Sequence, residues 1–208
     1  MKTIEEVLLN IKAVKLSPKT PFTYASGIVS PIYCDNRVII SYPYEREFVI
    51  SLFIDKINKT NVEFDVVAGT ATAGIPHAAW ISDFFKKPMI YVRSSKKNHG
   101  KENLIEGILK KGQKVILIED LLSTGGSSIN AAKAIRESGG LIDYVFAIFS
   151  YEMIKCKQNF KNENLKYETL GNISNIIDIA SDSGYISLED KNIILEWKRD
   201  PENWIKKR

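Results

Sequence analysis

The chain has 208 residues, of which 44% are apolar and 26% charged, and it holds only 12 Gly and 7 Pro. This length and balance are typical of one globular domain with its own hydrophobic core, and they exclude the collagen-like, coiled-coil and disordered classes. The 29 Lys and Arg exceed the 25 Asp and Glu to give a net charge of +4, which suits a polyanionic small molecule as well as it suits nucleic acid.

The cysteines, the N-terminus and the longest uncharged stretch bear on the cellular location of the protein. Cys34 and Cys156 stand far apart without metal-ligand spacing, so we expect two reduced thiols. The N-terminus carries Glu5 and Glu6 where a signal peptide would be basic and then apolar. The longest uncharged stretch, residues 66–82, is too short and too polar to cross a bilayer. We therefore expect a cytoplasmic protein with no membrane segment.

The first part of the chain is predicted to combine a helix with short extended segments. Thr3 and Glu6 fit a capping box, and apolar residues then recur at helical spacing, so a helix is expected to about Lys15. Residues 18–43 are rich in hydroxyl, Gly, Pro and aromatic side chains, which favours short extended segments separated by turns.

From residue 44 onward, predicted helices and strands alternate. Helices are expected at residues 44–58, 76–85 and 127–137, and aliphatic strands at residues 64–69, 88–92, 114–118 and 143–149. A strand pattern at residues 174–180 and a final helix opened by Ser187 follow. This alternation predicts an α/β fold with a doubly wound, mostly parallel sheet covered on both faces. Ligands of such sheets bind at the carboxyl ends of the strands.

The sharpest chemical signal is the sequence VILIEDLLSTGGSS at residues 115–128, a strand that ends in two acids, turns through glycines and enters a helix. The N–H groups of a helix start, with Gly125 and Gly126 allowing close approach, form a phosphate site. It is neither a Walker loop, since no Lys follows, nor a dinucleotide fingerprint, since the glycines are adjacent. Glu119 and Asp120 would repel a phosphate unless they accept hydrogen bonds from sugar hydroxyls or help to hold a cation. A ribose 5-phosphate has both a phosphate for the helix start and sugar hydroxyls for the acids. The alternative is an ordinary helix start with a capping Ser.

This sequence resembles the phosphoribosyl pyrophosphate motif of the type I phosphoribosyltransferases. Residues 22–33, 69–77 and 91–100 are similar to segments of the orotate phosphoribosyltransferases, particularly the form found in Gram-positive bacteria. The resemblance covers about residues 20–150. It implies the type I phosphoribosyltransferase fold in a single domain, residues 1–208, with a small N-terminal hood formed by about residues 1–43 and C-terminal elements.

The resemblance also implies a reaction. Ribose 5-phosphate would pass from phosphoribosyl pyrophosphate to N1 of orotate, giving orotidine 5'-monophosphate and pyrophosphate in pyrimidine (UMP) biosynthesis. Mg²⁺ would be held mainly by the substrate, with Asp120 as a candidate ligand. The alternatives are a phosphoribosyltransferase for another base and a non-catalytic regulator that senses phosphoribosyl pyrophosphate. Such regulators usually add a DNA-binding domain, for which we see no room before residue 20, and no basic helix indicates nucleic-acid binding.

Residues 93–103 contain no apolar residue in eleven, which taken alone is typical of a solvated surface loop. The resemblance instead implies a lid that closes over the substrates and reaches the neighbouring subunit's site, and therefore a homodimer. Its cations would receive the departing pyrophosphate, since that group accepts charge-assisted hydrogen bonds. The catalytic residues implied are Arg93, Lys97 and His99.

Carried over position by position, the resemblance assigns the substrate-binding residues. Glu119 and Asp120 would hold the ribose hydroxyls, Ser123 would bind orotate, and the backbone from residue 124 onward would bind the 5'-phosphate. Thr70 and Ala71 lie in the implied pyrophosphate loop, and Tyr33, with Asp35 and Arg37 nearby, would form part of the orotate pocket. The full motif is Glu119, Asp120, Leu121, Leu122, Ser123, Thr124, Gly125, Gly126 and Ser127.

The sequence departs from some branches of the family at three positions, one of which is Ser94, where those branches carry a further Lys. Those branches have Lys where Ala25 stands and Arg where Tyr151 stands, each a contact to orotate. Backbone groups or another residue, such as Arg37, would then meet the carboxylate here. His77 and the three Trp residues are expected to serve in packing.

Overall fold

One central sheet carries the motif that the sequence marks for chemistry. The computed structural model describes residues 2–24, 27–95, 104–201 and 203–204. Six strands lie in the order β10-β9-β8-β5-β6-β7, and all neighbours are parallel except β6 and β7. The predicted doubly wound, mostly parallel α/β fold is confirmed. The strands are β5 Val66–Thr70, β6 Met89–Val92, β7 Ile105–Glu106, β8 Lys114–Leu122, β9 Leu141–Ser150 and β10 Lys166–Asn172.

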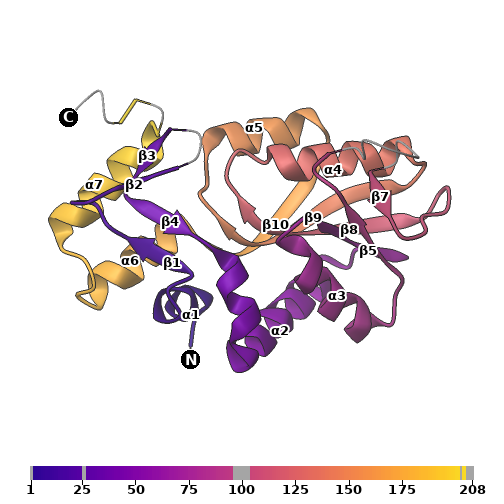
Figure 1. Ribbon diagram of the computed structural model, residues 1–208, viewed down its shortest axis with the longest axis horizontal. Helices are drawn as coiled ribbons and strands as arrows, with labels where there is room; N and C mark the ends of the chain where they lie inside the picture. Colours follow the sequence, from indigo (N-terminus) through magenta and orange to yellow (C-terminus); the bar gives the residue numbers. More distant parts are fainter. Residues whose placement is uncertain (1, 25–26, 96–103, 202, 205–208) are drawn as a thin grey trace.

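Helices cover both faces of the sheet (Figure 1). Helices α2, Pro43–Thr60, and α3, Gly74–Phe85, lie on one face, and α4, Gly126–Glu137, and α5, Ile154–Asn162, lie on the other. Successive side chains of a strand point to opposite faces, so Ile116 and Ile118 pack into the apolar cluster of α2 and α3, and Leu117 packs into that of α4 and α5. Burial on both faces explains why the strands are nearly continuous aliphatic runs.

Elements from the first and last parts of the described chain lie together beside the sheet (Figure 1). Strand β1 pairs antiparallel with β4, and β2 pairs antiparallel with β3. The last helix packs against these strands: its Trp197 is fully buried, and the indole N–H donates to the carbonyl of Val29 at 3.1 Å. These elements are α1 Ile4–Asn10, β1 Val14–Leu16, β2 Phe22–Thr23, β3 Val29–Ser30, β4 Ile32–Cys34, the 3-10 helix η1 Asn36–Ser41, α6 Ile173–Asp182 and α7 Leu188–Arg199.

Two predicted elements are wrong. The strand expected at residues 174–180 is helix α6, because the buried apolar residues from Ile173 to Ala180 recur at helical spacing and Asn172 caps the helix by accepting from the N–H of Asn175 at 2.9 Å. The first helix ends at Asn10 rather than near Lys15, and the residues that follow form β1. Helix α5 and strands β7 and β10 were not anticipated.

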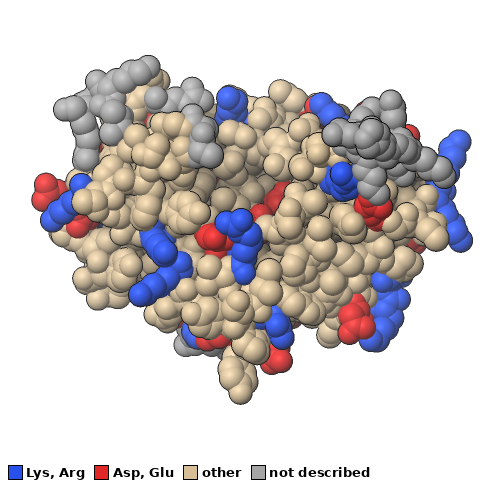
Figure 2. Space-filling model, in the orientation of Figure 1, with Lys and Arg blue, Asp and Glu red and all other residues tan. Residues whose placement is uncertain are grey.

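The hydropathy of the helices and the charges on one face of the molecule are as follows. None of the helices that the structure describes is both long and apolar enough to cross a membrane. On the face in Figure 2, basic side chains occur singly or in small groups among acidic ones, and the described residues of that face show no continuous basic patch.

Candidate functional site

The site lies where the strand order of the sheet reverses. From β5 the chain continues to β6 on one side, and it later returns to β8 on the other side of β5. The loops that follow β5 and β8 diverge at such a point and leave a crevice at the carboxyl ends of the strands. Thr70 ends β5 and Ala71 follows it, and Ser123 follows β8. Two segments that the sequence marks, residues 69–74 and 119–127, therefore meet at one edge of the sheet.

Glycine allows helix α3 to begin directly against β8. A Cβ on Gly74 would lie 2.3 Å from the carbonyl oxygen of Ile118, which no side chain tolerates. A Cβ on Gly69 would likewise lie 2.9 Å from the Cα of Ile75. Ala71 is held by its N–H, which donates to the carbonyl of Val92 at 2.9 Å. The loop after β5 is thus pressed against the strand that carries the two acids.

Two neighbouring acids, the buried Glu119 and the half-buried Asp120, lie near the end of β8. Glu119 is 5% exposed; one of its oxygens accepts from the hydroxyl of Ser128 at 2.9 Å, and the other accepts from the N–H of Asp120 at 3.1 Å. Burial, together with the charge of Asp120, raises the pKa of Glu119 to about 8. Burial also raises the pKa of Asp120. The carbonyl of Asp120 accepts from the side-chain amide of Asn36 at 2.6 Å, which ties η1 to this strand.

This pair is suited to hydroxyl donors or to a cation that arrives with its own ligands. Within the described ranges, no group of three or more His, Cys, Asp and Glu side chains could hold a metal by itself. Mg²⁺ usually keeps several waters or phosphate oxygens and takes only one or two carboxylates from the protein. Two neighbouring carboxyl groups whose pKa values are raised therefore fit a Mg²⁺ ion that a phosphorylated substrate carries.

The start of α4 is built as an anion site. Gly125 caps the helix in the left-handed region at φ 80°, where its absent side chain leaves room for the ring of Phe160; a Cβ would lie 2.5 Å from that ring. Asn159 fixes the loop by donating its side-chain amide to the carbonyl of Thr124 at 3.0 Å. The first helical bond runs from the N–H of Ile129 to the carbonyl of Gly125 at 3.0 Å, so the N–H groups of the preceding turn are available to a phosphate.

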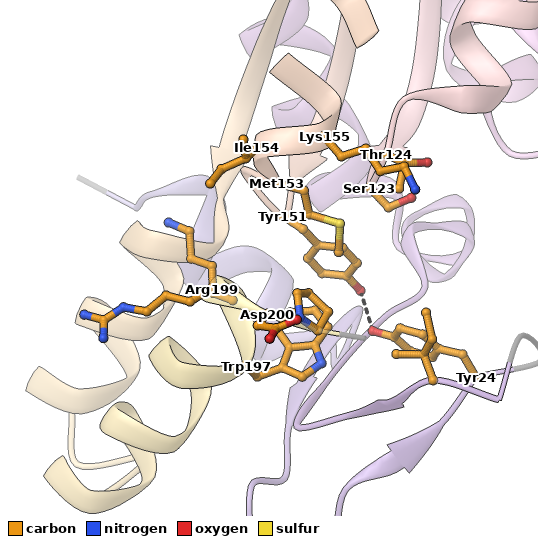
Figure 3. A pocket seen from close by; sticks show the side chains of 13 residues that line it. Tyr24, Ser123, Thr124, Tyr151, Met153, Ile154, Lys155, Trp197, Arg199 and Asp200 are labelled. Atoms are coloured by element: carbon orange, nitrogen blue, oxygen red, sulfur yellow. Dashed lines mark hydrogen bonds between the residues drawn. The ribbon is translucent and has the colours of Figure 1, made fainter. Parts of the chain in front are cut away.

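A cavity of about 490 Å³ adjoins this loop (Figure 3). Ser123 and Thr124 form one wall, and aromatic rings form the other. The hydroxyls of Tyr24 and Tyr151 are 3.2 Å apart, and the rings of Tyr151 and Trp197 pack edge to face at 5.7 Å. The cavity is lined by Tyr24, Ile28, Ser123, Thr124, Tyr151, Met153, Ile154, Lys155, Trp197, Lys198, Arg199, Asp200 and Pro201. Its size and aromatic walls suit a planar heterocycle.

The structure keeps several predicted residues away from this cavity. Tyr33 does not line it; its ring packs on those of Phe22 and Tyr24, at 5.5 and 6.4 Å. Arg37 is exposed and donates two hydrogen bonds to Asp35, at 2.6 and 2.8 Å. Leu122 is fully buried in the core, and Leu121 is partly buried against it.

The predicted lid lies mostly outside the described residues. Lys97 and His99 lie outside the described residues. Arg93 follows β6 at the edge of the crevice, with its guanidinium 3.8 Å from the carboxylate of Glu106 and its N–H donating to the carbonyl of Leu104 at 2.9 Å. Arg93, the first residue of the predicted lid, is thus bonded to β7 and to the residue that precedes it.

Sequence reasoning missed the residues that enclose the cavity from the C-terminal end. Trp197 lies in the core as expected, but it also walls the cavity, and Lys155 lines it from α5. Neither residue lies in a sequence motif, and only the tertiary structure shows that both line the cavity. His77 packs between the rings of Phe53 and Trp80, at 6.4 and 5.6 Å, and burial lowers its pKa to about 4, so it serves packing as expected.

Comparison with known proteins identifies what the chain resembles. Residues 45–148 match the phosphoribosyl transferase domain family. The orotate phosphoribosyltransferase of Listeria monocytogenes serotype 4b is 52% identical over 205 residues, which cover 99% of this chain and 98% of that protein. That of Coxiella burnetii is 51% identical over 201 residues, 97% of this chain and 96% of that protein. The crystal structure of orotate phosphoribosyltransferase from Aeropyrum pernix matches with a TM-score of 0.77 at 22% identity and covers 89% of this chain and 100% of that one.

Proposed function

The chain belongs to the orotate phosphoribosyltransferases, and we propose that the crevice between β5 and β8 is where it binds phosphoribosyl pyrophosphate and orotate. The reaction transfers ribose 5-phosphate to N1 of orotate, yields orotidine 5'-monophosphate and pyrophosphate, and serves pyrimidine biosynthesis. One observation carries the site assignment. Glu119 and Asp120 and the start of α4 at Gly125 lie side by side where the strand order of the sheet reverses, next to a cavity of about 490 Å³.

The donor is held by the segment from Glu119 to Ser127. The N–H groups at the start of α4 bind the 5'-phosphate, because they lack helical acceptors and lie at the positive end of the helix dipole. Glu119 and Asp120 accept hydrogen bonds from the ribose hydroxyls, which supply the donors that this buried pair needs. The backbone of Thr70 and Ala71 faces the pyrophosphate from the loop after β5.

Cleavage of the bond between C1 and the pyrophosphate oxygen creates an oxocarbenium-like carbon and a highly charged leaving group. Arg93, Lys97 and His99 stabilise that charge by charge-assisted hydrogen bonds, which strengthen as it develops. The segment that carries them excludes water that would otherwise hydrolyse the donor. When bound, Mg²⁺ neutralises part of the pyrophosphate charge, and Asp120 is the side chain best placed to contact it.

The base lies in the cavity beside Ser123. Its ring packs against the aromatic wall of Tyr24, Tyr151 and Trp197, and its reacting nitrogen faces the ribose held by the neighbouring loop. We further propose a homodimer in which the segment after Arg93 reaches the partner's site. Sedimentation at micromolar concentration tests this assembly: a monomer that is fully active would contradict it.

Base-dependent pyrophosphate release tests the function. The protein is incubated with Mg²⁺, labelled phosphoribosyl pyrophosphate and, in separate reactions, orotate, uracil, adenine or hypoxanthine. Release only with orotate is the expected result. Release with a different base would reassign the substrate, and binding of the donor with no release for any base would favour the sensing role.

A further inference from the structure

A hollow of about 450 Å³ lies at the end of the sheet away from the donor-binding loop. It is bounded by the second half of α5 and the first residues of β10, whereas the donor-binding loop follows the carboxyl end of β8. Three aromatic residues line the hollow: Phe160 is buried, and Tyr144 and Tyr167 are half-buried. Their rings give it an apolar surface on which a planar ring can stack.

Three lysines also line the hollow, Lys157, Lys161 and Lys166, and all three are exposed. Lys157 and Lys161 stand one turn apart on α5, so they lie on the same face of the helix. Among the described residues neither of these two forms an ion pair, and the acid that lines the hollow, Glu168, is paired with Lys56 at 3.5 Å. The hollow therefore carries an excess of positive charge beside aromatic rings, which suits an anion with an aromatic part.

The end of α5 does not oppose an anion in this hollow. The last carbonyl groups of a helix repel negative charge when they have no hydrogen-bond donor. Those of Asn159, Phe160 and Lys161 accept hydrogen bonds at 3.0 to 3.2 Å from N–H groups of the segment that connects α5 to β10. The lysine side chains therefore set the charge that an anion meets here.

The helix that bounds the hollow also holds the donor-binding loop. Phe160 lines the hollow, and its ring fills the space that a side chain at Gly125 would need, since a Cβ there would lie 2.5 Å from the ring. The next residue back, Asn159, donates to the carbonyl of Thr124 at 3.0 Å. Because packed side chains transmit displacement, a ligand that shifts α5 alters two contacts of the loop proposed to bind the 5'-phosphate.

We propose that this hollow is an effector site for a nucleoside polyphosphate. The nucleobase stacks on the half-buried tyrosines, and the phosphates bind the ammonium groups of Lys157 and Lys161 by charge-assisted hydrogen bonds. Two cations one turn apart, with Lys166 beside them, match a chain of phosphates better than a single one. Occupancy changes the affinity of the donor-binding loop for phosphoribosyl pyrophosphate through Asn159 and Phe160, a step that rests on the proposed function.

Titration calorimetry with UTP and with ATP, in the absence of the donor, tests the site. Both should bind, whereas inorganic triphosphate and uridine should each bind at least about tenfold more weakly, because each lacks one of the two kinds of contact. The double variant Lys157→Glu, Lys161→Glu should weaken UTP binding by at least about 30-fold. The matched variant Lys110→Glu, Lys111→Glu reverses two exposed lysines outside the hollow and should change UTP affinity by less than about threefold.

Undiminished binding of UTP to the Lys157, Lys161 double variant would place the nucleotide elsewhere and overturn the proposal, as would equal binding of inorganic triphosphate. The affinity for phosphoribosyl pyrophosphate is then measured with and without saturating UTP at one free Mg²⁺ concentration. It should change by at least about threefold in the wild-type protein and stay constant in the double variant. A constant affinity in the wild-type protein would overturn the effector role. If the protein binds no phosphoribosyl pyrophosphate at all, the proposed function fails, and the first titrations alone decide whether the hollow binds the nucleotide.

Discussion

Glu119→Gln should make the substrate-free protein more stable, and by an amount that grows with pH. The folded chain holds Glu119 with a pKa of about 8 against an ordinary value of 4.5. Below about pH 4.5 the carboxyl is protonated in both the folded and the unfolded chain; as pH rises toward 8, only the unfolded chain releases the proton, so the wild-type protein loses stability. At pH 7 this amounts to about 2.5 pK units, on the order of 3 kcal/mol. Gln keeps the size and an acceptor for the N–H of Asp120, and it carries no charge.

Urea unfolding at pH 5, 6, 7 and 8, without donor or metal, measures this effect. The buried Trp197 and Trp204 provide the fluorescence signal. The difference in free energy of unfolding between variant and wild type should be small at pH 5 and largest at pH 8. Glu137→Gln, which neutralises an exposed carboxyl at the other end of α4, should follow the wild-type curve. A difference that stays constant across this range would refute the argument that burial holds the proton on Glu119.

Three other substitutions test separate parts of the site. Asp120→Asn should weaken binding of phosphoribosyl pyrophosphate, measured by calorimetry, and unchanged affinity would remove Asp120 from the ribose contacts. Gly74→Ala places a Cβ 2.3 Å from the carbonyl of Ile118 and should lower the free energy of unfolding by about 1–3 kcal/mol, whereas Gly126→Ala, with its nearest neighbour at 3.8 Å, should cost far less. Lys97→Ala should lower kcat by orders of magnitude with a much smaller change in donor affinity; near-normal single-turnover rates would exclude it from catalysis.

The sheet and the donor-binding loop were predictable because their signals are local. Strands β5 and β8 are buried on both faces, so their aliphatic runs stand out in the sequence. The acids, glycines and hydroxyls that follow β8 lie next to one another along the chain, and the structure leaves them adjacent in space. Local chemistry of this kind needs no knowledge of tertiary contacts.

The base cavity was not predictable in the same way, since distant segments build it. Tyr24, Tyr151 and Trp197 lie far apart along the chain, and nothing local in the sequence indicates that their rings meet. The sequence likewise offered Arg37 as the cation for the carboxylate, because it could not indicate that Asp35 binds it at 2.6 Å. Helix α6 was mistaken for a strand because a short apolar run with several Ile residues fits both periodicities.

Binding of the donor should also be coupled to the release of a proton from the acid Glu119. A carboxyl group with a pKa of about 8 is mostly protonated at pH 7, but a carboxylate is the better acceptor for ribose hydroxyls and the better neighbour for a cation. Binding of the donor with Mg²⁺ should therefore lower the pKa of Glu119 and release up to about one proton at pH 7. Calorimetric titrations in buffers of different ionisation enthalpy count that proton, and Glu119→Gln should abolish its release. If the wild-type protein releases none, the acids bind the donor in their protonated form, and the ribose hydroxyls must then act as acceptors as well as donors.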